Sequence, residues 1–297
     1  MILSVSRRTD IPGCYPEWFM NRLRDKYVMT RNPMNFHQVS QINLSPDFIE
    51  CIVFWTKNAV PFMDYLEELN RMGYMYMFQY TITPYDNTLE KNISDKSDII
   101  KNVLELSEKK RIVWRYDPIL LNDTYTVNRH IELFEEMCSL LYTAVNHVVI
   151  SFIDLYQKNR GYRLYELSTD EITHLAQAFG EIGAKYKLPI KTCCENYDLT
   201  KFGITKGACI DSVLLEEICN RPLLLKKATG QRKNCLCAES VDIGAYHTCL
   251  NGCIYCYATD YKRLKTKQKC YDKNSQILCD KLDFGKDIIK VRKMKKL

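Results

Sequence analysis

The sequence predicts an α/β protein whose core is a complete or partial (β/α) barrel of the TIM type. Short runs rich in β-branched and aromatic residues alternate with amphipathic stretches along most of the 297 residues. Such alternation favours parallel strands joined by right-handed helical crossovers. The glycine patterns of phosphate loops and dinucleotide-binding turns, which accompany many open sheets, do not occur. These two observations favour a barrel over an open doubly wound sheet.

Six runs have the composition expected of strands, because β-branched and aromatic side chains suit a pleated, half-buried surface. A seventh and weaker run, at 37–44, suits either a strand or a hairpin. The six expected strands span 2–6, 51–55, 75–82, 112–115, 147–153 and 189–194.

The stretches between these runs carry helix signals. One starts at Pro61, a favoured first helical residue, and stops before Gly73, which suits a helix end. Another follows Ser168 and Glu171, which form a capping-box sequence. The other expected helices span 16–26, 98–109, 126–142 and 211–219. We expect a barrel domain over 1–220 and a cysteine-rich segment with a basic tail over 221–297.

Composition narrows the class of protein. No apolar run is long enough to cross a membrane, and the first residues lack the layout of a signal peptide, so we expect a cytoplasmic protein without a membrane partner. In that compartment, fourteen cysteines are better explained by metal, cluster or catalytic roles than by disulfides. The net charge is +6, with basic residues gathered in 262–269 and 290–296. These stretches suit a solvated tail, and nucleic-acid binding is the less favoured alternative.

Polar residues follow nearly every expected strand. In a barrel the chemistry gathers where the strands end, so we expect a binding site there. Arginine and lysine suit a carboxylate or phosphate, while aspartate can move protons or bind hydroxyl and amine groups. The alternative is that these side chains cap helices and form ion pairs. The residues expected to bind substrate or take part in catalysis are Arg8, Asp10, Lys57, Arg115, Asp117 and Asp154.

Three cysteines near the C-terminus form the most informative motif. Cys249, Cys253 and Cys256 have the spacing C-x3-C-x2-C, and Tyr255 precedes the last of them. Three thiolates leave one iron of a four-iron cluster without a protein ligand, whereas a structural zinc site normally takes a fourth ligand. The spacing therefore favours an iron–sulfur site, and a zinc knuckle or unrelated thiols are the alternatives.

This motif, with Gly252 and Ala258 beside it, resembles the cluster loop of the radical S-adenosylmethionine superfamily, especially its photoproduct-lyase-like members. The resemblance implies a [4Fe-4S] cluster on the three cysteines, S-adenosylmethionine on the open iron and a 5′-deoxyadenosyl radical. It also implies an electron donor such as flavodoxin or ferredoxin. We expect Tyr255, Asn58 and Glu195 to contact the cofactor.

The loop follows the expected barrel, whereas that superfamily places it after the first strand. Either the arrangement is permuted in chain order, or the loop covers the barrel mouth from outside, and we expect the second. A methionine-binding Gly-Gly-Glu strand is also missing from the sequence.

The chain as a whole resembles a bacterial family of unknown function, domain-of-unknown-function family 1848. The resemblance rests on segments spread over nearly the full length, and it implies no activity. These segments are Ser6-x-Arg8-Thr9-Asp10-Ile11-Pro12, Val53-Phe54-Trp55-Thr56-Lys57-Asn58, Trp114-Arg115-Tyr116-Asp117-Pro118, Ser151-Phe152-Ile153-Asp154 and the cysteine motif.

Four further cysteines suit an auxiliary iron–sulfur cluster at the barrel rim, or else are buried apolar residues. They are Cys194, Cys209, Cys235 and Cys237. Together these observations favour a radical S-adenosylmethionine-type enzyme acting on an unknown small or nucleotide-like substrate. The alternatives are a barrel hydrolase or lyase with a structural zinc lid, and a nucleic-acid-binding or repair-associated protein.

Overall fold

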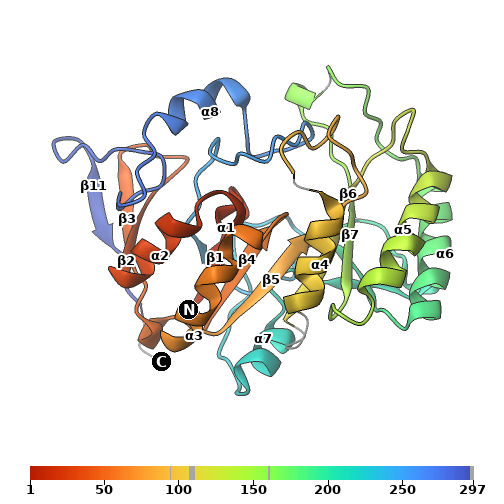
Figure 1. Cartoon of the computed structure of the whole chain (residues 1–297), viewed down its shortest axis with the longest axis horizontal. Coiled ribbons are helices and arrows are strands. Elements are labelled where there is room, and N and C mark those ends of the chain that lie inside the picture. The colour runs from red at the N-terminus through yellow and green to blue at the C-terminus, as the bar shows by residue number, and fades with distance from the viewer. Residues whose placement is uncertain (94, 107–110, 160, 295–297) are drawn as a thin grey trace.

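A sheet of eight parallel strands forms the centre of the protein (Figure 1). The computed structural model describes residues 1–93, 95–106, 111–159 and 161–294. The strand order is β10-β1-β4-β5-β6-β7-β8-β9, so neighbours in the sheet follow the chain except that β10 lies beside β1. The strands are β1 (Ile2–Val5), β4 (Cys51–Thr56), β5 (Tyr76–Thr81), β6 (Ile112–Ile119), β7 (Val148–Phe152), β8 (Ile190–Cys193), β9 (Ile204–Gly207) and β10 (Ser240–Asp242).

The two edge strands, β9 and β10, are not joined by a ladder in the described part of the chain. The segments next to them do meet, because Ala238 donates its amide to the carbonyl of Ile210 at 2.9 Å. The described architecture is therefore a parallel α/β sheet with helices around it.

Helices follow most of the strands and cover one face of the sheet (Figure 1). Helices α5 and α6 pack against each other beyond β7, α7 lies at the opposite end of the sheet from α8, and α2 and α3 flank β1 and β4. The helices are α1 (Ile11–Cys14), α2 (Pro16–Arg24), α3 (Leu66–Arg71), α4 (Lys96–Leu106), α5 (Val127–Leu141), α6 (Thr169–Tyr186), α7 (Ser212–Cys219) and α8 (Tyr261–Gln268).

Alternate residues of each strand point to opposite faces of the sheet, and the two faces differ. On the helix-covered face, Phe54, Phe78 and Trp114 belong to the main hydrophobic core. On the other face, which we call the inner face, Val53 and Met77 pack in a separate apolar cluster with residues of α7. The sheet therefore separates two hydrophobic layers.

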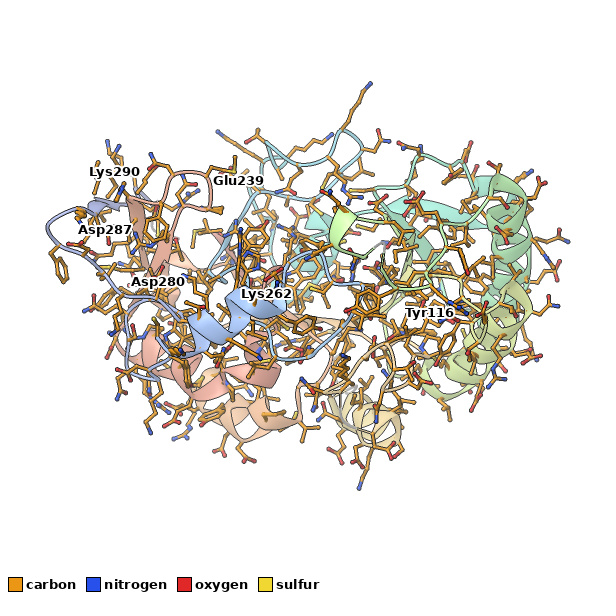
Figure 2. All side chains as sticks on the ribbon, turned by 90° about the horizontal axis from the view of Figure 1, so that it is seen from above. Tyr116, Glu239, Lys262, Asp280, Asp287 and Lys290 are labelled. Carbon is orange, nitrogen blue, oxygen red and sulfur yellow. The ribbon has the colours of Figure 1, made fainter. Side chains whose placement is uncertain are left out.

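A second, smaller sheet has the order β11-β3-β2. Strands β2 (Tyr27–Arg31) and β3 (Gln38–Asn43) are antiparallel, and β11 (Ile288–Val291) runs parallel to β3. Arg31 anchors the C-terminal segment through ion pairs to Asp280 at 2.8 Å and Asp287 at 2.6 Å. Figure 2 shows both aspartates at this end of the molecule, near Lys290.

Each of the six expected strands is present, and the run at 37–44 is a strand of the small sheet. Strands β2, β9, β10 and β11 and helices α1 and α8 were not expected. The helix expected at 61–72 is a 3-10 segment, Val60–Tyr65, followed by α3. The helix expected at 98–109 ends at Leu106, and 107–109 lie outside the described residues.

Strand β10 pairs with β1, so the central sheet includes part of the expected second domain, and the boundary at 220 stays a prediction. None of the described helices is both long and apolar enough to cross a membrane.

Candidate functional site

The cysteine loop, residues 248–259, is fixed over the carboxyl ends of β1, β4, β5 and β7. Ile254 donates its amide to the carbonyl of Leu89 at 3.0 Å, and Asn92 donates its amide to the carbonyl of Asn251 at 3.1 Å. Asn159, which follows β7, donates its side-chain amide to the carbonyl of Ile254 at 2.6 Å. The main chain of the loop is therefore held by hydrogen bonds from several strand-end segments.

Asp10 clamps the loop to the first two strand ends. Its Oδ2 accepts hydrogen bonds from the Lys57 amide and from the Asn251 side chain, both at 2.8 Å. Its Oδ1 caps α1 by accepting from the Gly13 amide at 2.9 Å. Burial raises the pKa of this carboxyl, although these hydrogen bonds oppose the rise. The contacts give Asp10 a positioning role at the site.

A buried ion network lies beneath Cys253. Glu90 accepts from the ammonium groups of Lys57 at 2.7 Å and Lys96 at 2.5 Å, and its carboxyl is 1% exposed. The hydroxyl of Tyr255 also donates to Glu90. Burial alone would raise the pKa of Glu90, but the two ammonium groups outweigh burial and lower it to about 2. Two cations and one anion leave this network with an excess positive charge.

The three thiols of the loop are close enough to affect one another. Burial raises the pKa of Cys253, with further contributions from Cys249 and Cys256, while Lys57 acts in the opposite direction. Lys158 similarly opposes the raised pKa of Cys256, and its Nζ donates to two carbonyls of the loop. Cationic groups therefore lie beside two of the three thiols.

Cys14, at the end of α1, is a fourth thiol next to this loop. A contact with Cys14, followed by burial, raises the pKa of Cys249 well above its ordinary value. The sulfur of Cys14 also lies 3.6 Å from Oδ1 of Asn251. Cys14 carried no spacing signal in the sequence, because more than two hundred residues separate it from Cys249.

The donor chemistry of the loop fits an iron–sulfur cluster. Thiolates are the usual protein ligands of such clusters, and neighbouring cations stabilise thiolates. Lys57 and Lys158 supply these cations. As the side chains stand, no group of three or more His, Cys, Asp or Glu within the described ranges is gathered so that it could hold a metal ion.

Polar side chains of the inner face form a floor at the carboxyl ends of the strands. Arg115 is paired with Asp117, which also accepts from the hydroxyl of Ser151. The guanidinium carbons of Arg115 and Arg7 lie 5.3 Å and 5.0 Å from the ring centre of Trp55. Burial would lower the pKa of Arg115, but Cys209 and Asp117 hold it well above its ordinary value.

The cysteine loop and this floor face the same region. Asp117 contributes to the raised pKa of Lys57, although burial acts against that rise and Glu90 has the larger favourable effect. Glu195 follows β8 at the same end of the sheet, and its carboxylate accepts a hydrogen bond from the Phe152 amide at 3.0 Å. Burial raises the pKa of Glu195 to about 7, so this carboxyl can hold or release a proton near neutral pH.

The contacts of three other expected site residues are made outside the cysteine loop. Arg8 lies 5.1 Å from the ring centre of Tyr246 and donates to the carbonyl of Gly244 at 3.4 Å. Asn58 accepts from the Val60 amide at 3.0 Å and so shapes the loop after β4. Asp154 is 59% exposed and pairs with Arg232 at 2.8 Å.

The rim cysteines meet in a different combination from the expected one. Cys193, at the end of β8, has its sulfur 2.9 Å from the sulfur of Cys209. Cys194 contacts Cys193, and Cys237 contacts Cys209. Cys235 is buried in the inner-face apolar cluster. The auxiliary cluster remains a prediction. Its expected ligands did not include Cys193, which contacts Cys209 and Cys194.

Several residues of the site had no signal in the sequence. Glu90 and Lys96 lie after β5, outside any expected strand end, and Trp55 was expected as part of a strand and of a family segment but not as a site residue. Several of the residues that they contact lie on segments distant in the sequence, which only the folded sheet brings together.

The chain matches the family described as "Domain of unknown function (DUF1848)" over residues 2–258. No curated protein matches the sequence. Among solved structures, one from Bacteroides thetaiotaomicron VPI-5482, described as a "putative alpha-L-fucosidase", is 13% identical with a TM-score of 0.23. The likeness covers 51% of this chain and 66% of that chain, just under two thirds of its length. At this TM-score the likeness carries no argument about fold or activity.

Proposed function

We propose that this chain, which belongs to the DUF1848 family, is an iron–sulfur enzyme of the radical S-adenosylmethionine type. The observation that carries the proposal is the position of the cysteine loop. Its three thiols lie over the polar carboxyl ends of parallel strands, where α/β proteins place their active sites. We further propose that the eight strands act as the wall of a TIM-like barrel whose mouth the loop covers.

Cys249, Cys253 and Cys256 would hold the [4Fe-4S] cluster. When bound, a cluster with one open iron supplies single-electron chemistry to S-adenosylmethionine. The protein's part is to hold the loop, orient the reactants and keep water out. The hydrogen bonds of Asp10, Asn92 and Asn159 to the loop support that part of the proposal.

The ion network fixes a cation at the edge of the loop. Glu90 and Thr83 hold the ammonium of Lys57 at 2.7 Å and 3.4 Å, so its position is set before any ligand arrives. A fixed ammonium suits the carboxylate of an amino-acid cofactor. Tyr255 lies against the same network through its hydroxyl, and its ring centre is 5.7 Å from Nζ of Lys57.

The floor supplies the substrate side of the site. Arg115 and Asp117 present a buried cation and a partly exposed anion, and Trp55 presents a ring that two guanidinium groups approach. This set suits a small or nucleotide-like substrate with polar groups. Glu195, with its pKa near 7, is the group placed to hold or accept a proton.

An external protein must supply the electron, and we propose a small acidic carrier such as flavodoxin or ferredoxin in the cytoplasm. The charge of α8 supports this choice, because the helix follows the cysteine loop and carries Lys262, Arg263 and Lys265 on exposed positions. Figure 2 shows Lys262 on this helix.

The test is anaerobic reconstitution with iron and sulfide, followed by absorption and electron paramagnetic resonance spectra with and without S-adenosylmethionine. We expect a four-iron signal that changes when S-adenosylmethionine is added. Cys253→Ser should abolish it, whereas Cys138→Ser, which removes a buried thiol on α5, should leave it intact. A colourless protein after reconstitution would overturn the proposal. A cluster signal that does not change with S-adenosylmethionine would leave the cluster with a role in electron transfer only.

A second candidate is a closed zinc centre that acts as a structural lid. The contact between Cys14 and Cys249 favours it, because a fourth thiol completes the shell that structural zinc requires. Cys14→Ser separates the two candidates. An open cluster should keep its spectrum in this variant, whereas a closed zinc centre should lose its equivalent of zinc.

A further inference from the structure

Thiols from three separate segments meet in the floor of the site. Cys193 is the last residue of β8, Cys209 lies two residues beyond β9, and Cys237 precedes β10. The sulfurs of Cys193 and Cys209 are 2.9 Å apart, and Cys237 contacts Cys209. This group lies where the two edges of the sheet approach each other, because Ile210 accepts from the amide of Ala238.

Arg115 lies directly against the pair. Its Nη1 is 2.9 Å from the sulfur of Cys209, and its other amino group is paired with Asp117. A guanidinium stabilises a thiolate relative to a thiol. The contact with Cys193 and burial act the other way and raise the pKa of Cys209 to about 12. Both cysteines are free thiols, and the guanidinium lies where it can stabilise the thiolate of Cys209.

The arrangement suits a disulfide. The sulfurs of Cys193 and Cys209 are already within contact distance of each other. A disulfide needs only two sulfurs that can meet. If these two cysteines only filled space in the core, apolar neighbours would be enough. Instead, the charged side chain of Arg115 contacts the sulfur of Cys209.

We propose that Cys193 and Cys209 form a redox-active dithiol that low-molecular-weight disulfides convert into a disulfide. The exchange begins at Cys193, which is partly exposed, whereas Cys209 is 4% exposed. The thiolate of Cys193 attacks one sulfur of the reagent, forms a mixed disulfide and releases one reagent thiol. The thiolate of Cys209 then attacks the sulfur of Cys193 and releases the second thiol.

The exchange is balanced. Two electrons pass from the cysteine pair to the reagent, whose S–S bond breaks as the protein bond forms. The two cysteine protons end on the two released thiols. Closure takes the thiol away from Arg115 and joins β8 to the segment after β9, so the floor changes with the redox state. None of the cysteine-loop thiols takes part, and the inference goes beyond the proposed function without resting on it.

The experiment uses the full chain with Cys219→Ser, because trypsin leaves Cys209 and Cys219 in one peptide, 207–226. The reduced protein is treated with 2-hydroxyethyl disulfide at pH 8.5, where exchange is faster, then alkylated and digested. We expect peptide 192–201 joined to peptide 207–226 and reversal of this link by dithiothreitol.

Two neighbouring substitutions identify the partner, because peptide 192–201 also carries Cys194. Cys193→Ser should abolish the link, and Cys194→Ser should keep it. Circular dichroism of each variant before oxidation confirms that it is folded. A link that survives Cys193→Ser, or a folded protein that forms no link, overturns the proposal. Bound zinc that is lost with either Cys193→Ser or Cys209→Ser overturns it in favour of a metal site.

Discussion

The two faces of the central sheet are built from the same strands yet have different compositions. On the helix-covered face the strand side chains belong to the main hydrophobic core, and Trp114, Phe134 and Phe179 stack with ring centres 5.4 Å and 3.9 Å apart. On the inner face the amino ends are apolar, but the carboxyl ends carry Arg115 and Asp117. The difference shows that one face holds the fold together while half of the other is available for chemistry.

Trp114→Ala should have the largest effect on stability. The side chain is fully buried, and its indole nitrogen donates to the carbonyl of Ile82 at 2.9 Å. Truncation leaves a cavity and an unpaired carbonyl, and we expect a loss of about 3–5 kcal/mol in the free energy of unfolding. Urea denaturation measures it. A loss below that of a typical surface variant would show that the helix-covered face is not the main source of stability.

Glu90→Gln comes next, because it removes the carboxylate that pairs with both ammonium groups of the buried network. Lys57 and Lys96 would then share a buried space without a carboxylate, and we expect a loss of roughly 3 kcal/mol. The matched control is Glu135→Gln, whose carboxylate pairs with Lys185 at 2.5 Å on the exposed surface. If urea denaturation shows that both substitutions lower the free energy of unfolding equally, the expected difference between buried and exposed ion pairs is wrong.

The helix-covered face should also lose stability in mild acid. His130 is buried, and its two ring nitrogens contact the hydroxyl of Tyr116 and the carbonyl of Leu120, both at 2.8 Å. Burial lowers its pKa from 6.5 to about 4. The unfolded chain therefore binds a proton that the native state excludes between these values, so stability falls as the pH falls.

The expected slope from His130 is at most about 1.4 kcal/mol per pH unit. Unfolding measured from pH 7 to pH 4.5 should show a shallower slope for His130→Gln than for the unsubstituted chain. Some slope should remain, because burial also lowers the pKa of His147 to about 3. An unchanged slope in His130→Gln would show that the imidazole is not held neutral.

Asp154→Asn should have the smallest effect. Its carboxylate and the Arg232 guanidinium are about equally exposed, at 59% and 61%, so solvent screens the pair. We expect the free energy of unfolding to change by less than about 0.5 kcal/mol. A larger loss in urea denaturation would mean that this strand end belongs to the buried part of the site.

The sequence was informative where the signal is local. Periodicity and β-rich composition located six of the eight strands of the central sheet, and cysteine spacing located the loop. Strand β9 ends in Lys206 and Gly207, and β10 has Val241 between two polar residues, so neither has a clear composition signal. They form because their neighbours supply hydrogen-bonding partners. Asp10 and Asp154 looked alike as acidic strand-end residues, yet only Asp10 is buried. Burial depends on which distant segment covers a residue, and sequence does not show it.

The clamp between Asp10 and Asn251 joins residues that are 241 positions apart. During synthesis, most of the strands leave the ribosome before the cysteine loop has been made. A chain that stops just after β10 would carry the residues of all eight strands but not the three thiols proposed to hold the cluster. The proposed cluster could therefore load only after translation has passed Cys256, the last cysteine of the loop.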